Sequence, residues 1–286
     1  MPFGYVSPEQ QMRDKADYAR KGIARGRSVV VLQYEHGILF VAPNPSRALH
    51  KISEIYDRIG FAAVGRYNEF EALRLGGIRY ADINGYNYAR DDVTARGLAN
   101  LYAQNLGQIF TESMKPFEVE IVVAEVGDSS DEDHIYRLTF DGSVFDETGL
   151  VAMGGQAEAV AGRLKERYRD GLPLAEALEA ALFALTEPGG ERSPASQLEV
   201  AVLDRNRPHR KFLRLAGPRL ERLLAEGAAT SATPATPATP GEAEAPATAP
   251  EGDVDTGSNS RRGRHTRGEP ARGTGEDMRL RPCAPD

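Results

Sequence analysis

Ser28 and Lys51 are the two side chains of the N-terminal region that could together carry out covalent chemistry. Ser28 opens the apolar run SVVVLQY, and the turn EHG leads from it into a second apolar run, ILFVA. A hydroxyl at the start of a strand becomes a nucleophile when the preceding residues are removed, because the freed α-amine then acts as its base. With Lys51 as a helper, this pattern gives one hypothesis: a self-processing hydrolase that loses residues 1–27.

The sequence gives little support to metal or phosphate sites. The histidines are scattered over turns, edges and the C-terminal region without the spacing of metal ligands: His36, His50, His134, His209 and His265. The pairs Gly76-Gly77 and Gly154-Gly155 are not followed by the Lys-Ser/Thr of a phosphate-binding loop. We therefore expect no metal, no cofactor and no ATP hydrolysis by this chain.

Charge and cysteine content restrict the class of protein further. The net charge is −7 and the isoelectric point is near 5.4, which opposes general binding to nucleic acid. Only the basic run RRGRHTR, residues 261–267, keeps a nucleic-acid-binding alternative open. Cys283 is the single cysteine, and no segment has the apolar length of a signal peptide core or of a membrane span. We predict a cytoplasmic protein without membrane contact.

Composition divides the chain into three parts. After Gly227 the triplet Ala-Thr-Pro repeats, and Glu, Ala, Pro, Gly and Thr dominate the residues after the repeats. Such a stretch buries too little apolar surface to offset the entropy of ordering it. We predict a flexible segment over residues 1–7, a folded domain over residues 8–227 and a disordered tail over residues 228–286.

The folded domain is predicted to open with an amphipathic helix over residues 8–25. Ser7 is a suitable N-cap, Pro8 fits the first helical position, and Gln10 could complete a capping box. Apolar residues then recur at helical spacing and should pack on the body of the domain: Met12, Ala16, Ala19 and Ile23.

The rest of the domain alternates groups of strands with pairs of helices. Strands are predicted at 28–34, 37–42, 51–56, 59–65, 117–127, 134–140, 149–155, 197–205 and 211–216. Helices are predicted at 94–114, 156–169, 173–187 and 217–227, and a further helical pattern after Arg66 is interrupted at Gly76-Gly77. Runs of strands separated by paired helices favour two antiparallel sheets with a helix layer on each outer side. The predicted fold class is α+β, a four-layer αββα sandwich.

The chain resembles the α-subunits of the proteasome, and most of all their actinobacterial type. The resemblance covers about residues 2–226, and its carriers are SPEQQMRDKADYARKGIARG, SVVVLQYEHGILFVA, NPSRALHKISEIYDRIGFAAVGRYNEFEALR, GGIRYADINGYNYARDDVTARGLANLYAQNLGQIFTE, KPFEVEIVVAEVG, YRLTFDGSV and LEVAVLDRNRP. It implies a fold of the N-terminal-nucleophile hydrolase type. It also implies a seven-membered ring of this subunit, stacked on rings of catalytic β-subunits.

The same resemblance implies that this chain is not an enzyme by itself. Family alignment puts Arg27 where a catalytic subunit has its nucleophilic threonine, and a guanidinium cannot attack a carbonyl. The acid of the catalytic set falls at Pro43 or Asn44, neither of which is anionic. Only Lys51 matches its catalytic counterpart.

Two functional sites are implied by the resemblance. Lys51 is expected to line a pocket between neighbouring subunits and to pair there with the C-terminal carboxylate of a ring-shaped AAA ATPase activator. The N-terminal segment is expected to close the axial pore, although it lacks the Tyr-Asp-Arg motif of archaeal and eukaryotic relatives. The predicted gate consists of Pro2, Phe3, Gly4, Tyr5, Val6 and Ser7. The expected substrates are unfolded proteins, marked in actinobacterial relatives by a small protein modifier that the ATPase reads.

Overall fold

The computed structural model describes residues 7–46 and 48–232. The chain divides into two units at residues 236–237, and the second unit lies outside the described residues. The helices are α1 (Pro8–Ala24), α2 (Tyr67–Asn87), α3 (Ala95–Glu112), α4 (Ala157–Arg167), α5 (Leu174–Leu185) and α6 (Pro218–Ala232). The strands are β1 (Val29–Tyr34), β2 (Gly37–Pro43), β3 (Ile52–Tyr56), β4 (Ile59–Gly65), β5 (Val119–Glu125), β6 (His134–Leu138), β7 (Val144–Glu147), β8 (Leu150–Met153), β9 (Leu198–Asp204) and β10 (Phe212–Leu215).

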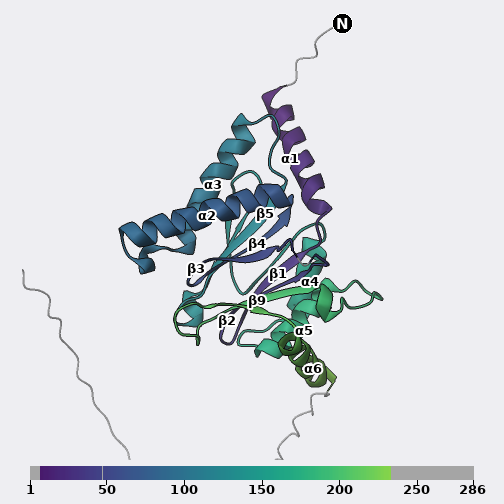
Figure 1. Ribbon diagram of the computed structural model, residues 1–286. Coiled ribbons are helices and arrows are strands. Elements are labelled where there is room, and N and C mark those ends of the chain that lie inside the picture. The colour runs from purple at the N-terminus through teal and green to yellow at the C-terminus, as the bar shows by residue number, and fades with distance from the viewer. Residues whose placement is uncertain (1–6, 47, 233–286) are drawn as a thin grey trace, which may run out of the picture. The chain divides into compact units, whose positions relative to one another are not determined.

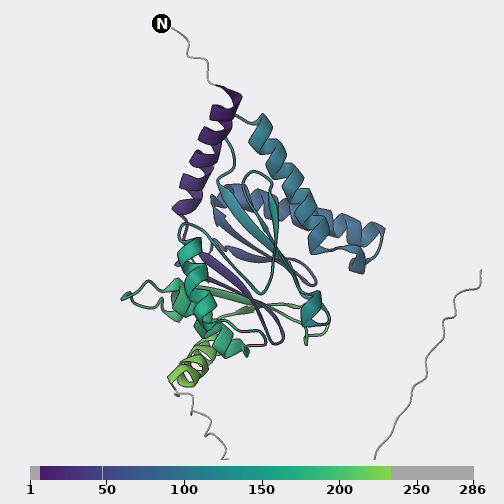
Figure 2. The ribbon, with the colours of Figure 1, turned by 180° about the vertical axis from the view of Figure 1, so that it is seen from behind.

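The strands form two five-stranded antiparallel sheets. One has the order β10, β9, β2, β1, β8, and the other follows the chain from β3 to β7. Helices α2 and α3 lie over the second sheet, and α4, α5 and α6 lie over the first, so the predicted αββα sandwich is confirmed (Figure 1). The view from behind shows the same layers (Figure 2).

Three apolar cores hold the layers together. The central core lies between the sheets and includes Phe40, Val122 and Leu203. The outer cores join Tyr102 to the second sheet and Leu178 to the first. Strands covered on both faces have almost uninterrupted apolar sequences, as in β2, β4, β5 and β9.

Helix α1 begins as the sequence predicts but packs over a shorter length. The Ser7 hydroxyl accepts a hydrogen bond from Gln10 N at 3.2 Å, which caps the helix. The Gln10 side chain donates to Asp14 instead of completing a capping box. Met12 is 37% exposed, so its predicted packing on the body is wrong. The reason is that only the C-terminal half of α1, with Ala19 and Ile23, reaches the central core (Figure 1).

Helix α2 runs through the glycine pair that was predicted to interrupt it. Gly76 is exposed, whereas Gly77 is buried where a Cβ would overlap the hydroxyl oxygen of Tyr102 on α3. The second glycine therefore lets the two helices pack closely, and tertiary packing outweighs the low helix propensity of glycine.

The C-terminal helix α6 continues beyond the predicted boundary at Gly227 and ends at Ala232. It packs on α5, with Leu220 buried in the outer core, while residues 228–230 are exposed. The remainder of the predicted tail lies outside the described residues, as do Cys283 and the basic run at 261–267. Within residues 7–46 and 48–232, no helix has the length and apolar character needed to cross a bilayer.

Candidate functional site

Lys51 lies directly before β3 and points to the loop that precedes β1. Its ammonium donates a hydrogen bond to the carbonyl oxygen of Arg27, with 2.9 Å between Nζ and O. An ammonium has three donors, and this bond uses one of them. The structure therefore brings together two of the positions that sequence reasoning selected, the lysine and the residue in the nucleophile's place.

The surroundings of Lys51 lower the pKa of its ammonium. Burial, and then the nearby positive charge of Arg27, lower the pKa of Lys51 to about 8, while the negative charge of Glu199 opposes that shift. An anion close to the ammonium of Lys51 would raise this pKa again, because a nearby negative charge favours the protonated form.

Sequence reasoning missed Glu199, the carboxylate that organises this site. Glu199 is 6% exposed on β9, where it lies opposite Ala42 of β2. Burial alone would raise its pKa, but hydrogen bonds from Lys51 N, Asn44, Arg214 and Ile52 N lower it, so the group is ionised at neutral pH. The only signal in the sequence is one acidic residue inside the otherwise apolar run LEVAVL.

The predicted acid position has a different role in the structure. Pro43 ends β2, and Asn44 follows it as a buried amide. Asn44 Nδ2 donates to Glu199 at 2.7 Å and to the carbonyl oxygen of Leu49 at 2.8 Å. The site thus contains a carboxylate, that of Glu199 on β9, and the amide of Asn44 at the predicted acid position donates a hydrogen bond to it.

A hollow of about 420 Å³ opens beside Arg27. Its lining comes from the end of α1, the loop before β1, the start of α4 and the segment before β9: Ala24, Arg25, Gly26, Arg27, Ser28, Pro43, Gly155, Gln156, Val160, Leu185, Glu187, Ser193 and Gln197. Two exposed guanidinium groups, those of Arg25 and Arg27, border this hollow. The exposed carboxylate of Glu187 lines it as well, so only the side formed by Arg25 and Arg27 is suited to an anionic chain segment.

Ser28 does not have the environment of a nucleophile. Ser28 precedes β1, and Lys51, the proposed helper in the hydrolase hypothesis, donates a hydrogen bond to the carbonyl oxygen of Arg27. The upstream residues form α1, a capped helix with Ala19 and Ile23 in the central core. Removing residues 1–27 would therefore take away part of that core.

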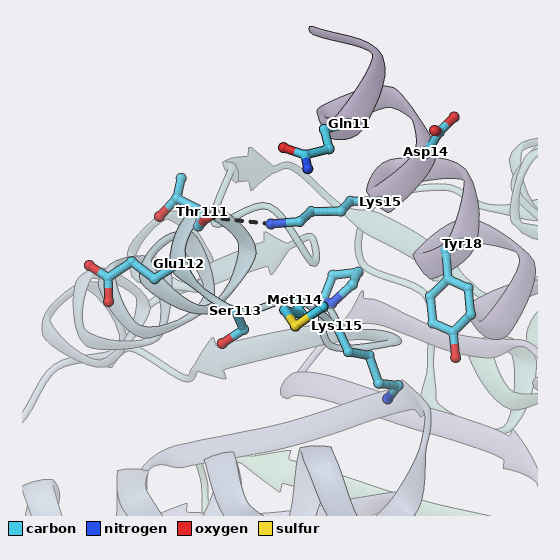
Figure 3. Close-up of a pocket in the computed structure, with 10 residues that line it drawn as sticks. Gln11, Asp14, Lys15, Tyr18, Thr111, Glu112, Ser113, Met114 and Lys115 are labelled. Atoms are coloured by element: carbon cyan, nitrogen blue, oxygen red, sulfur yellow. Dashed lines mark hydrogen bonds between the residues drawn. The ribbon is translucent and has the colours of Figure 1, made fainter. Parts of the chain in front are cut away.

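A second hollow, of about 570 Å³, separates α1 from the end of α3. Figure 3 shows Lys15 extending across it from α1 toward Thr111. Lys15 Nζ donates to the carbonyl oxygens of Phe110 at 3.0 Å and Thr111 at 3.3 Å. A cation at the C-terminal end of a helix is favoured by the unpaired carbonyls there. Lys15 thereby fastens the N-terminal half of α1 to α3.

An ionic cluster with two buried glutamates supports the C-terminal end of α1. Lys115 Nζ lies 2.5 Å from Glu69 and 3.2 Å from Glu118, and Arg66 Nε lies 3.1 Å from Glu118. Gly22 of α1 sits directly on Glu118, because a Cβ there would overlap a carboxylate oxygen. The helix is thus fixed both at Lys15 and at Gly22.

The predicted gate is only partly described. Ser7 caps α1, and Pro2, Phe3, Gly4, Tyr5 and Val6 lie outside the described residues. The gate hypothesis therefore gains a well-anchored starting point in α1. Across the residues that the structure describes, no cluster of three or more potential metal ligands is present.

Comparison with known proteins gives a consistent family relationship. Residues 23–203 match the family described as Proteasome subunit. A protein named proteasome subunit alpha from Streptosporangium roseum is 98% identical over 259 residues, which cover 91% of this chain and 99% of that protein. The proteins of that name from Thermomonospora curvata and Streptomyces coelicolor are 72% identical over 229 residues and 66% identical over 235 residues. Each match covers 80% of this chain, with 99% and 92% of the respective relative.

Proposed function

Because this chain belongs to the proteasome subunit family, as an α-subunit of the 20S core, we propose that it gates substrate access and docks a ring-shaped ATPase. It is a non-catalytic subunit of a threonine protease complex. This excludes the self-processing hydrolase with Ser28 as nucleophile. Assembly with β-subunits follows from its place in the core complex. The seven-membered ring, the cytoplasmic location and the degradation of unfolded, modifier-tagged proteins are part of the proposal.

The observation that carries the docking proposal is the partly buried ammonium of Lys51, which bonds to the carbonyl oxygen of Arg27, a residue that lines the hollow together with Arg25. An added anion would favour the charged form of Lys51, because burial and Arg27 both disfavour its charge. A C-terminal carboxylate on a mobile activator tail would supply that anion and could bond to the free donors of the ammonium. Truncating one partner of a partly buried charge pair typically weakens binding by about 2–5 kcal/mol.

The test is the substitution Lys51→Ala in the assembled α–β particle, with stimulation of peptide hydrolysis by a cognate ring ATPase as the readout. We expect stimulation to be lost while particle size and basal hydrolysis stay unchanged. Lys211→Ala is the matched control, because Lys211 also donates from a partly buried position to two main-chain carbonyls, those of Arg205 and Arg207. Stimulation of the Lys51→Ala particle at the wild-type activator concentration would refute the docking assignment.

The gate proposal rests on α1, the helix that follows the predicted gate, which is fixed near its middle by Lys15 and near its C-terminal end at Gly22. Deleting residues 2–6 should raise peptide hydrolysis by the assembled particle, since the pore loses its closing segment. Ser7 is kept in this variant so that α1 retains its N-cap. Ser7→Ala alone serves as the control for helix fraying. An unchanged rate of hydrolysis for short and long peptides alike would remove the gating role.

A further inference from the structure

The carboxylate of Glu199 accepts hydrogen bonds from three parts of the chain. Oε2 accepts from Lys51 N at 2.9 Å and from Asn44 Nδ2 at 2.7 Å. Oε1 accepts from Ile52 N at 3.1 Å and from Arg214 Nη1 at 2.6 Å, and His50 Nδ1 lies 3.2 Å from it. The main-chain N–H groups of Lys51 and Ile52 therefore both bind this buried carboxylate, so the backbone of the proposed docking lysine is held by Glu199.

This arrangement fixes the Lys51 backbone without occupying its ammonium. Both oxygens of Glu199 are used by other donors, and no carboxylate of the described residues forms an ion pair with Lys51 within 4.0 Å. The ammonium makes its bond to Arg27 O and retains donors for an incoming anion. A direct Glu199–Lys51 pair would instead compete with such an anion.

We propose that Glu199 is a positioning residue for activator docking: it orients Lys51 through the main chain and supports its positive charge without pairing with it. This inference rests on the proposed docking function. The charged or titratable groups around Lys51 come from separate elements: Arg27 before β1, His50 before β3, Glu199 on β9 and Arg214 on β10. Glu199 is the anion in this set, and the guanidinium of Arg214 holds it in place through bonds to Glu199 and to Ile52 O.

The substitution Glu199→Gln separates the charge from the shape. A glutamine has almost the same size, but it has one acceptor oxygen instead of two. Its NH2 group would take the place of the other oxygen and would face the N–H donors that now bind Glu199. Removing the negative charge takes away what opposes the fall in the pKa of Lys51. The alkaline limit of docking should therefore move to lower pH, and binding just below the wild-type limit should weaken.

The experiment measures binding of a labelled peptide with the C-terminal residues of the cognate ATPase to assembled α–β particles, from about pH 7 to about pH 9.5. The same peptide with an amidated C-terminus reports binding that does not use the carboxylate. Glu199→Asp keeps the charge and should keep the wild-type pH limit, whereas His50→Gln tests whether the imidazole contributes to it. Glu179→Gln is the matched control, because Glu179 is equally buried and paired with Arg192, but lies on α5.

The outcomes are distinguishable. Loss of binding in Lys51→Ala together with a lowered pH limit in Glu199→Gln supports both proposals. Loss in Lys51→Ala with a wild-type pH limit and affinity in Glu199→Gln overturns the role of Glu199 and leaves docking intact. Wild-type binding by Lys51→Ala refutes docking itself. If Glu199→Gln fails to assemble, the affinity of Glu199→Asp decides. Its shorter side chain keeps the charge but draws the carboxylate away from Lys51 N and Ile52 N, so weaker binding at the wild-type pH limit supports the positioning role and wild-type affinity overturns it.

Discussion

At the residue scale, Lys51 is a position from a catalytic fold that we propose to serve binding. Arg27 stands where a nucleophile would be, and its carbonyl oxygen now accepts a hydrogen bond from the lysine. The lysine was predictable because a family resemblance fixes its place along the chain. Glu199 was not, because it lies on a strand far along the sequence and meets Lys51 only after β9 pairs with β2. A single sequence does not reveal such a pairing partner.

The lowered pKa of Lys51 predicts a pH dependence of activation. Lys51 is protonated below about pH 8 and loses its charge as pH rises through that value. Stimulation by the ATPase should therefore fall above about pH 8 in the wild-type particle. Lys51→Arg should stay charged over this range, because a guanidinium does not titrate below about pH 12. Whatever stimulation this variant retains should not show the alkaline fall.

The measurement is the ratio of stimulated to basal peptide hydrolysis across the pH range. The basal rate is the internal control, since it reports the catalytic β-subunits and the gate without the activator. An alkaline fall of the same size and midpoint in Lys51→Arg would show that another group titrates.

At the element scale, the order of the predicted elements and most boundaries followed from apolar spacing and turn residues, but the short, exposed strand β7 (Val144–Glu147) was not predicted. The other failures concern packing between elements that lie apart in the sequence. The N-terminal half of α1 extends past the central core, so Met12 follows the helical stripe without packing on the body. Helix α2 continues through Gly76-Gly77 because α3 packs against the second glycine. Local helix propensity predicts neither the exposure of Met12 nor the continuation of α2 through the glycine pair.

Gly76 and Gly77 of α2 give opposite predictions for the same substitution. Gly77→Ala should lower the free energy of unfolding by about 1–3 kcal/mol, because its Cβ would overlap the buried Tyr102 side chain. Gly76→Ala should raise it by about 0.5–1 kcal/mol, because nothing lies within 4 Å of its Cβ and alanine favours the helix. Thermal unfolding of the two variants beside the wild-type protein makes the comparison. Equal effects of both substitutions would contradict the close α2–α3 packing.

The attachment of α1 to α3 also makes a prediction. Lys15→Ala removes the bonds from Lys15 to the carbonyls of Phe110 and Thr111, so the helix that presents the gate should be held less firmly. We expect higher basal peptide hydrolysis by the assembled particle. Lys21→Ala, which removes an exposed lysine of the same helix, is the control. If both variants hydrolyse peptide at the wild-type rate, this contact has no influence on the gate.

At the scale of the whole molecule, the αββα architecture was predictable because strand groups and helix pairs alternate along the chain. The end of the folded part was less so. Composition changes after Gly227, yet α6 continues to Ala232, although its buried residues within 218–230, Leu220 and Gly227, do not lie beyond that boundary. The residues of the sequence alone also allowed the hypothesis of a hydrolase with Ser28 as nucleophile. Family membership removes it, and the anchoring of α1 explains why the upstream residues are needed in the fold.

The most direct test of the proposed role is co-expression of this chain with a cognate β-subunit, followed by particle sizing, intact mass and peptide hydrolysis. We predict that the chain alone hydrolyses no peptide and keeps residues 2–27. Together with the β-subunit it should form a large particle that hydrolyses peptide with the β-subunit threonine as nucleophile. A chain that forms no large particle with any β-subunit, or hydrolysis by the chain alone after loss of residues 1–27, would contradict that role.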